Sequence, residues 1–377
     1  MGKESAEKAW TKCVHMDVSE LKALAAAGLV QMFDTKRRLF CFRLKRDRDT
    51  FVREGFSPRY TIMTLLGLHR LETSGLGSPV EIRPIFRSLL ESYDWINNIG
   101  DVGLILWLCA VTSPENLQAI CSSLRVESAL DRFRGARHGR TMELAWFLSG
   151  LSHASMEMPA RKRLDLKNLA VNAYEALKKN QGDHGIFGHQ ATGRSLPGIL
   201  RGHIGSFADQ VYPIYALTQF AKAYNIQAAL RIARNCADAI CRAQGPLGQW
   251  WWHYDALKGV VSQRYPVYAV HQDGMAPMAL FALSEATGVD YDEPIYRGLA
   301  WINGNNELGA DLRDRSSGVI WRSIYRPTSW KKYRDEVCEL LRPERAAESV
   351  GDLKILFECR PYHLGWLLYA FAGRDCD

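Results

Sequence analysis

The stretch SFADQVYPIYALTQF, residues 206–220, predicts one inner helix of a helical barrel. Its opening signature is Asp209, then Pro213, then an apolar run, and it returns 64 residues later with Asp273 and Pro277. Two copies at such a distance indicate a repeat of helical hairpins.

Four more apolar segments of similar length open with a polar cluster, near Arg59, Asp101, Glu143 and Glu358. A buried helix that opens onto a cavity is expected to carry such a cluster at its start. Six inner helices are therefore predicted, and outer helices are expected at residues 17–32, 84–98, 114–132, 164–180, 226–244 and 293–303. We expect an all-α protein, an (α/α)6 barrel of six helical hairpins.

The whole chain, 1–377, is expected to form one barrel domain with a polar arm at 1–16 and a rim insertion at 305–357 that holds a helix at 329–341. The later repeats are longer than a minimal hairpin, and the excess falls between outer and inner helices. These loops should gather at the rim where the inner helices begin. The basic segment at 36–49 is expected to be a solvated hairpin or loop.

A net charge of +7 is explained by solubility alone, with an anionic small-molecule ligand as the sharper alternative, and the lack of a long basic run argues against nucleic acid. The nine cysteines are scattered and show no CxxC spacing, which predicts free thiols in a reducing compartment. No apolar run is long enough to span a bilayer, and the first ten residues lack an apolar signal core. We therefore expect a cytoplasmic protein, and a homo-oligomer stays open.

A second repeat closes the outer helices. Gln181-x-x-x-Gly185-x-Phe187 is matched by Gln244-x-x-x-Gly248-x-Trp250, and Asn305 falls in a degenerate third copy. This pattern resembles the QW motif of the α/α-toroid superfamily of terpenoid cyclases and protein prenyltransferases. The hairpin count is similar to that of the six-hairpin barrels of glycosidases, polysaccharide lyases and sugar epimerases. The resemblance implies the fold and leaves the chemistry open.

One string departs from that superfamily. Class II cyclases use a DxDD acid, and the nearest match here, Asp290 to Glu293, falls at the start of an outer helix. Aspartate is favoured there as a helix cap, so we interpret the string as a cap and not as an acid.

If the barrel closes, the polar starts of the inner helices meet at one end of its cavity. Converging carboxylates raise one another's pKa and can keep a general acid protonated. The predicted catalytic residues are Asp209, Asp273, Glu143 and His271. Capping of helix N-termini explains any single acid equally well, but it does not require the neighbouring Tyr, His and Arg.

The string GQWWWHYD, residues 248–255, is expected to turn at least one indole into the cavity, because three consecutive Trp cannot all face one core. A hydrophobic plug at the rim is the alternative. The predicted substrate-binding residues are Arg59, Tyr60, Asp101, Tyr212, Trp250, Trp251, Trp252, His253, Arg264, Gln272, Arg360 and His363.

Three functions stay open at this point. The first is a carbohydrate-active enzyme, a hydrolase, lyase or epimerase, that acts on an anionic saccharide with carboxylate and His groups as acid and base. The second is a terpene-cyclase-like enzyme acting on an isoprenoid diphosphate, and the third is a scaffold without catalysis. We expect neither cofactor nor metal, although Asp209 or Asp273 could imitate a prenyltransferase zinc site with Cys359 and His363.

Overall fold

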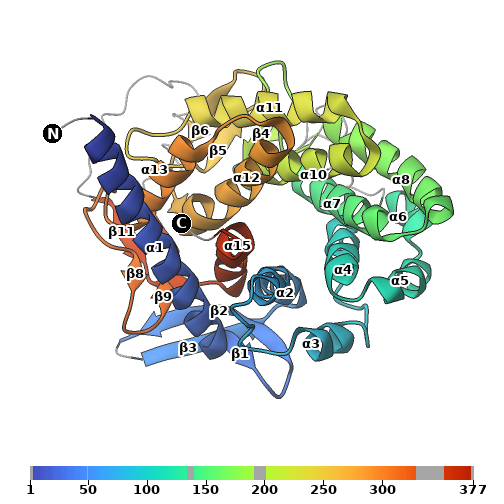
Figure 1. Cartoon of the computed structure of the whole chain (residues 1–377), viewed down its shortest axis with the longest axis horizontal. Coiled ribbons are helices and arrows are strands. Elements are labelled where there is room, and N and C mark those ends of the chain that lie inside the picture. The colour runs from blue at the N-terminus through green and yellow to red at the C-terminus, as the bar shows by residue number, and fades with distance from the viewer. Residues whose placement is uncertain (1–2, 49, 134–139, 191–200, 328–351, 375–377) are drawn as a thin grey trace.

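The structure is a computed structural model, and it describes residues 3–48, 50–133, 140–190, 201–327 and 352–374. Most of this part of the chain is helical (Figure 1). The inner helices are α2 (Pro58–Thr73), α4 (Ile99–Thr112), α7 (Thr141–Glu157), α10 (Ala208–Tyr224), α12 (Ala276–Thr287) and α15 (Pro361–Phe371). A π-helical turn, His271–Met275, precedes α12.

The outer helices lie around them: α1 (Lys3–Met32), α3 (Ile82–Leu89), α5 (Leu117–Ser123), α6 (Ala129–Arg132), α8 (Ala160–Lys178), α11 (Gln227–Arg242) and α13 (Asp292–Ile302). In the described part of the chain, each inner helix packs against the next in sequence, and α15 packs against α2. The contacts between inner helices therefore run in cyclic order, as Figure 1 shows.

The composition of each helix explains its layer. Inner helix α4 is apolar on every side and buried along nearly its whole length, because outer helices cover one face and the other inner helices cover the opposite one. Outer helix α11 buries a stripe that includes Ala229, Ala233 and Ala237 at every fourth position and leaves its charges outside. Helix α2 begins after Ser57, whose Oγ accepts a hydrogen bond from the backbone N–H of Tyr60.

The repeated Gln-Gly-aromatic turns have a structural role. Nε2 of Gln181 donates to the carbonyls of Gly185 and Ile232, and Nε2 of Gln244 donates to those of Gly248 and Pro294. Each Gln thus closes its own turn and ties it to the next outer helix.

The third copy follows the same rule. Nδ2 of Asn306 donates to the carbonyl of Ala310, four residues on, as the two glutamines do. The equivalent position is therefore Asn306, and Asn305 lies beside it.

The predicted repeat equates Asp209 with Asp273, and the structure shows that this alignment is wrong by two residues. Oε1 of Gln210 accepts the N–H of Phe187, and Oε1 of Gln272 accepts the N–H of Trp250. The glutamines are thus equivalent, and His271 is the counterpart of Asp209.

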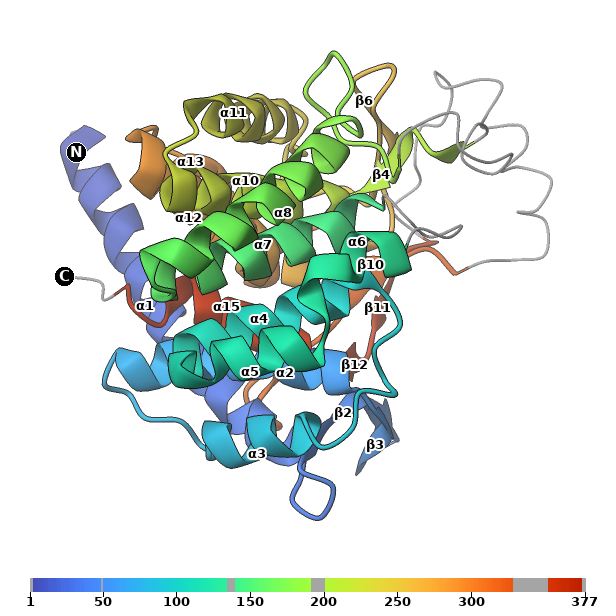
Figure 2. The ribbon, with the colours of Figure 1, turned by 90° about the vertical axis from the view of Figure 1, so that its right-hand side faces the viewer.

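The prediction of an all-α chain is wrong in part, because the rim carries small sheets (Figure 2). Hairpin strands β2 (Leu39–Asp47) and β3 (Thr50–Phe56) join β1 (Phe33–Asp34) and β12 (Glu358–Cys359). The others are β4 (Ile204–Ser206) with β5 (His253–Asp255) and β6 (Val260–Gln263), β7 (Val267–Tyr268) with β10 (Ser323–Tyr325) and β11 (Lys354–Leu356), and β8 (Arg313–Asp314) with β9 (Val319–Ile320). Where long loops extend from the barrel, their backbone N–H and C=O groups form hydrogen bonds with one another in these sheets.

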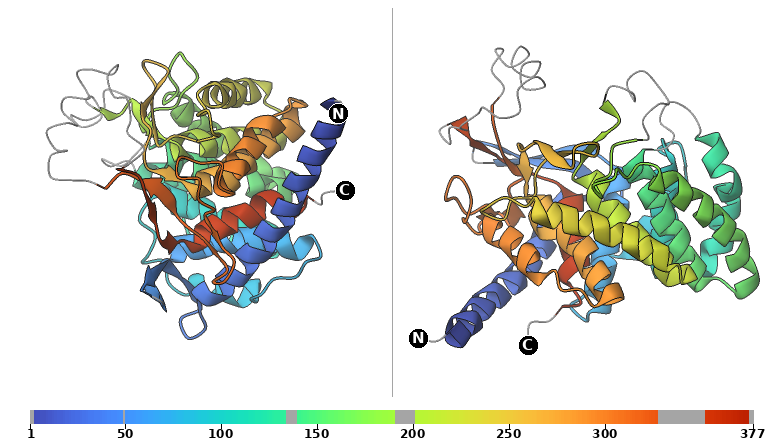
Figure 3. Two further views of the ribbon diagram at one scale, coloured as in Figure 1. Left: turned by 90° about the vertical axis from the view of Figure 1, so that its left-hand side faces the viewer. Right: turned by 90° about the horizontal axis from the view of Figure 1, so that it is seen from above.

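Other differences are local. Helix α1 already begins at Lys3, where a polar arm is expected, and it extends past the ring (Figure 3). The outer segment expected at 114–132 is broken into short helices. The predicted helix at 329–341 lies outside the described residues. Asp290 forms a turn just before α13, since its Oδ1 accepts the N–H of Asp292, but the N-cap residue is Tyr291 and no side chain caps the helix.

Figure 2 shows the strands β2 to β4, β6 and β10 to β12 together at one end of the ring. The inner helices begin at this end, which we call the loop rim. The first turn of α1 and the last turn of α15 lie at the opposite end. The loops therefore gather where the sequence predicts them.

Candidate active site

Glu143 lies in the first turn of α7, at the loop rim. The residue is 6% exposed, and its carboxylate lies 3.6 Å from Nη1 of Arg140. Burial raises the pKa of Glu143, and the positive charges of Arg140, Arg59 and His189 oppose this shift without cancelling it. A carboxyl group with a raised pKa keeps its proton closer to neutral pH, as a general acid must.

His189 belongs to the loop that follows α8 and reaches the same place. Its Nδ1 lies 3.1 Å from Oδ2 of Asp209, and its side chain is 40% exposed. The hydrogen bond to Asp209 raises the pKa of His189, against the effect of burial. Because Asp209 engages Nδ1, the other ring nitrogen is the one that can meet a substrate.

The carboxylate of Asp209 is occupied by hydrogen bonds. Oδ1 accepts the N–H of Met142 at 3.1 Å, and Oδ2 accepts both the N–H and the hydroxyl of Ser206 at 2.9 Å. The residue is 1% exposed. Asp209 therefore joins the starts of α7 and α10 and orients His189, a positioning geometry.

Arg59 and Asp101 form a bidentate pair between α2 and α4. The two N–H to carboxylate distances are 2.6 and 3.0 Å, and the N–H of Asn97 also donates to Asp101. Asp101 is fully buried, while 31% of the Arg59 side chain is exposed. The guanidinium lies 5.7 Å from the centre of the Trp146 ring. The exposed part of Arg59 can still bind an anion.

Asp273 and His363 lie together in the core. Nε2 of His363 is 2.8 and 2.9 Å from the two carboxylate oxygens, and both residues are almost fully buried. Burial alone would lower the pKa of His363, but the charge and hydrogen bond of Asp273 raise it to about 9. The carboxylate of Asp273 thus favours the protonated form of His363, and the pair ties α15 to the π turn before α12.

His271 is buried among aromatic rings. The centres of Phe207 and Tyr268 lie 4.6 and 5.2 Å from it. Burial lowers the pKa of His271 to about 3, and its Nδ1 has no partner among the described residues. It is a neutral ring at working pH and cannot serve there as a cation.

The three tryptophans divide between core and rim. Trp250 is 0% exposed and Trp251 is 7% exposed, whereas Trp252 is partly exposed and packs edge-on against Tyr268 with ring centres 4.8 Å apart. His253 is partly exposed and hydrogen-bonded to Gln263, and Arg264 is exposed over the Trp251 ring. Trp252 is therefore the one of the three that is not buried, and its orientation into the cavity stays a prediction.

The remaining predicted binding residues divide into buried and partly exposed ones. Tyr212 is 3% exposed and packs edge-on against Trp146, and Gln272 is fully buried. Tyr60 is partly exposed and contacts Tyr362, with ring centres 4.5 Å apart. Arg360 donates to Glu358.

The structure thus brings Glu143, Arg59, Asp101 and Asp209 to one stretch of rim. Three side chains beside the predicted ones were not foreseen: Arg140, His189 and Arg322. Arg140 directly precedes α7, and His189 follows the first Gln-Gly-aromatic turn by two residues, so both could have been found from their place in the repeat. Arg322 lies in a loop without a repeat signal.

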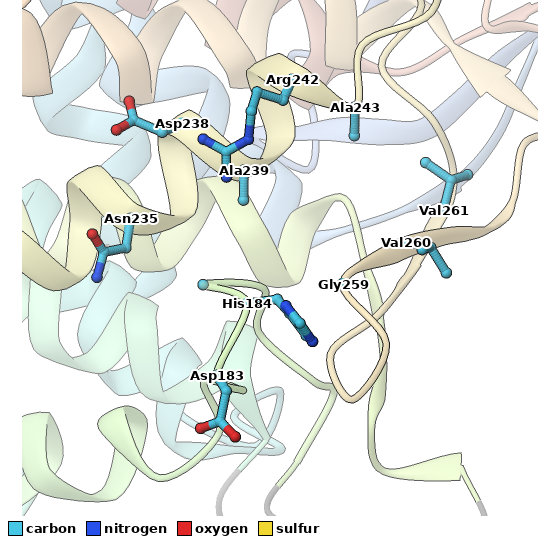
Figure 4. Close-up of a pocket in the computed structure, with 11 residues that line it drawn as sticks. Asp183, His184, Asn235, Asp238, Ala239, Arg242, Ala243, Gly259, Val260 and Val261 are labelled. Carbon is cyan, nitrogen blue, oxygen red and sulfur yellow. The ribbon is translucent and has the colours of Figure 1, made fainter.

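A separate cavity of about 690 Å³ opens on the outside of the ring (Figure 4). It lies between α11, the turn at His184 and the β5–β6 hairpin. Of its two acids, Asp183 and Asp238, the second already accepts a hydrogen bond from Tyr291 and pairs with Arg234. None of the predicted site residues lines it.

Across the described residues, no three side chains of His, Cys, Asp or Glu are grouped so that they could bind a metal ion. Within the same part of the chain, the helices are too short or too polar to cross a bilayer.

Comparison with solved structures identifies the architecture. A possible GH105 family member from Klebsiella pneumoniae superposes with a TM-score of 0.60 and 11% identity, over 94% of this chain and 92% of that one. An unsaturated glucuronyl hydrolase from Bacillus sp. GL1, responsible for glycosaminoglycan degradation, gives 0.57 and 13%, over 94% of both chains. The chain has the α/α-toroid fold of these hydrolases.

A mutant of the unsaturated glucuronyl hydrolase from Streptococcus agalactiae, complexed with dGlcA-GalNAc6S, gives a TM-score of 0.58 and 12% identity over 96% of this chain and 92% of that one. No protein-family model matches the sequence, and no curated protein matches it. At these identities the α/α toroid is shared, and the residues of the site must be argued from this chain alone.

Proposed function

We propose that this α/α toroid is a glycoside hydrolase that acts on an anionic saccharide, with Glu143 as the general acid. The observation that carries the proposal is the environment of Glu143, a carboxyl group at the loop rim with a pKa raised by burial and with Arg140, Arg59 and His189 around it. Glu143 can donate a proton, and the cations around it can bind a negatively charged group. Together they suit acid-catalysed cleavage of a charged sugar.

In this proposal Glu143 donates its proton to the sugar as the glycosidic bond is lost. Water supplies the hydroxyl group, and the proton that water gives up returns to the carboxylate of Glu143. Arg59, Arg140 and the exposed nitrogen of His189 hold the negative group of the substrate. Asp209 positions His189 and does not touch the substrate.

The substrate class follows from the solved structures of the same fold, which are unsaturated glucuronyl hydrolases. We propose an oligosaccharide that ends in an unsaturated glucuronyl residue. We further propose that the ring is the complete six-hairpin barrel in a single domain, and that the protein works in the cytoplasm without a cofactor. The free cysteines among the described residues are compatible with that compartment.

The test is to incubate the purified protein with unsaturated glucuronyl disaccharides and follow the ultraviolet absorbance of the conjugated double bond. Wild-type protein should consume the substrate, and Glu143→Gln should slow turnover by a factor of about 100 or more while the circular dichroism spectrum stays unchanged. Full activity of Glu143→Gln would exclude Glu143 as the acid.

The isoprenoid alternative is less well supported by the packing inside the ring. Trp107, Tyr215 and Tyr369 contact one another, with ring centres 4.8 to 6.0 Å apart, so these aromatic faces are occupied by one another. A rise in melting temperature with a prenyl diphosphate, and none with uronate disaccharides, would favour that alternative. A stable protein that binds neither would favour the scaffold.

A further inference from the structure

A second cationic cluster lies on the loop rim, on the other side of α2 from Glu143. Its centre is Glu358 in β12, which is 3% exposed. Arg322, Arg360 and Arg43 form ion pairs with its two oxygens, at N–O distances of 2.9 to 3.1 Å. Three guanidinium groups around one buried carboxylate are more than charge balance requires.

A second acid only partly offsets this excess. Glu54 in β3 also pairs with Arg43, so three arginines face two carboxylates and one positive charge is left over. Arg43 and Arg360 have clear structural roles. Arg43 ties β2 to Glu358 in β12, and Arg360 ties the start of α15 to Glu358 and to the carbonyl of Phe42 in β2. Arg322 is the cation that these contacts do not explain.

Arg322 has an unused donor. Its Nε meets Glu358 at 3.1 Å, and its guanidinium lies 4.9 Å from the centre of the Tyr268 ring. Its Nη1 is buried and has no hydrogen-bond partner among the described residues. A buried N–H group without an acceptor costs about 1–3 kcal/mol, so an acceptor is expected from beyond the described residues, and a bound anion can supply it.

The backbone holds Arg322 in place. The N–H of Arg322 donates to the carbonyl of Leu356, and its carbonyl accepts the N–H of Ala269. The residue therefore sits between the flanking strands β7 and β11, and its side chain is 18% exposed. A cation fixed in this way needs little reorganisation to bind an anion.

Three tyrosines lie close enough to Arg322 to interact with its charge: Tyr60, Tyr268 and Tyr362. All are partly exposed. Burial raises the pKa of Tyr60 to about 12 and also raises that of Tyr268, so these hydroxyl groups remain neutral donors. Neutral O–H donors beside a guanidinium form a binding site suited to a carboxylate or sulfate.

We propose that Arg322, with Tyr60 and Tyr362, binds a second anionic group of the saccharide, a carboxylate or sulfate on the sugar next to the reacting one. The position of the site supports this assignment. Arg59 lies beside Glu143, and the next residue in α2, Tyr60, lies near Arg322, so the two groups of side chains are neighbours on the loop rim. A saccharide that reaches Glu143 can therefore extend over Arg322. This inference rests on the proposed function for the identity of its ligand.

The first experiment measures binding without turnover. Inorganic sulfate and glucuronate are titrated separately into the full chain by calorimetry, for wild type and Arg322→Gln. We expect the substitution to weaken binding of at least one probe by about tenfold, as for a lost charge-assisted hydrogen bond. Arg322→Lys should restore part of the affinity. Equal affinities of wild type and Arg322→Gln for both probes would overturn the site.

Arg313→Gln is the matched control. Arg313 is also an arginine with a nearly buried side chain, and it pairs with Glu20 and Asp311 away from this cluster. It should lose stability without a change in anion affinity. Tyr362→Phe removes only a hydroxyl group and should weaken the binding of the same probe by a few-fold while the melting temperature stays near that of wild type.

A kinetic experiment then separates this inference from the proposed function. On an unsaturated glucuronyl disaccharide with and without a sulfate on the second sugar, Arg322→Gln should raise KM and leave kcat nearly unchanged. A rise for the sulfated sugar alone assigns Arg322 to the sulfate of the second sugar. An equal rise for both would place Arg322 at the carboxylate of the reacting sugar and overturn the second-anion site. Unchanged KM on both substrates with normal turnover would overturn the Arg322 site and leave the function standing. If there is no turnover but anion binding still depends on Arg322, the proposed function is overturned and the Arg322 site stands.

Discussion

Acidic residues at four inner-helix starts have different surroundings, and those surroundings decide their roles. Asp209 accepts hydrogen bonds from two backbone N–H groups and a hydroxyl, Asp101 is matched by Arg59, and Asp273 is matched by His363. Burial raises the pKa of both Glu143 and Asp273, but only Glu143 lies at the rim among several cations. The sequence predicts where these acids lie, but it cannot show which partners satisfy them, because the partners come from distant segments.

The pH dependence of turnover should report Glu143. A general acid must be protonated, so the rate should fall as pH rises through the raised pKa of Glu143. The charge of Arg140 lowers that pKa, so Arg140→Gln should move the alkaline limb of kcat/KM to higher pH. The measurement is a pH profile of both proteins with Arg374→Gln, a surface pair with Glu285, as control. A shift to lower pH would contradict the assignment.

The buried pair of Asp273 and His363 should make stability depend on pH. The pKa of His363 rises from its ordinary 6.5 to about 9 on folding, so the folded state binds the extra proton. The stabilisation is complete below pH 6.5 and is lost as pH rises through 9, on the order of 3 kcal/mol.

Asp273→Asn leaves a buried imidazole without its anion and should cost about 3–5 kcal/mol at pH 7. It should also flatten the decline between pH 6.5 and 9. Denaturant unfolding over a pH series measures both effects, with His184→Gln on the exposed turn as control. An unchanged slope in Asp273→Asn would show that another group causes the decline.

The helices and turns were largely predictable, because their signals are local. Pro58 and Ser57 mark the start of α2, and the Gln-Gly-aromatic pattern marks the turns after α8 and α11. The register of the repeat was misassigned because an aspartate is favoured at any helix start. The repeated contact is made by Gln210 and Gln272, whose amides bond to a backbone in another segment.

The turn glycines should be intolerant of a side chain for two separate reasons. Gly248 has φ of +93°, and a Cβ there would overlap the carbonyl of Arg297 in α13. Gly288, at the end of α12, has φ of +72° but open space around its Cβ position. Gly288→Ala should therefore cost about 1 kcal/mol, from backbone strain alone.

Gly248→Ala should cost about 1–3 kcal/mol more than Gly288→Ala, because the turn must also move off α13. Urea unfolding of both variants gives the comparison directly. Equal losses of unfolding free energy in the two variants would mean that Gly248 is required only for its backbone conformation and not for its contact with α13.

The order of inner helices around the ring could be predicted from the number of repeats, whereas the sheets of the loop rim could not. Strands β7, β10 and β11 come from segments separated by dozens of residues, and each is only two or three residues long. Such short strands have no periodic signal of their own. The Arg322 cluster depends on these sheets, which explains why the sequence pointed to Tyr60 and Arg360 on this side of the rim but not to Arg322.

Closure of the ring rests on a contact between the first and last inner helices. A Cβ on Gly67 of α2 would overlap the backbone of Gly365 in α15, so the two helices meet backbone to backbone. Gly150 of α7 meets Gly103 of α4 in the same way, but these helices are neighbours in sequence. Both contacts depend on the absence of a side chain, so alanine at either site should cost at least about 1–3 kcal/mol.

The two substitutions should destabilise different pairs of helices. Gly67→Ala should increase hydrogen exchange in α2 and α15 together, and Gly150→Ala in α4 and α7. Because α2 and α15 hold Tyr60 against Tyr362, Gly67→Ala should also weaken sulfate binding, while Gly150→Ala should not. Unchanged exchange in α15 of Gly67→Ala would show that the ring does not depend on this contact, and the two halves of the rim would then have to be joined by the sheets alone.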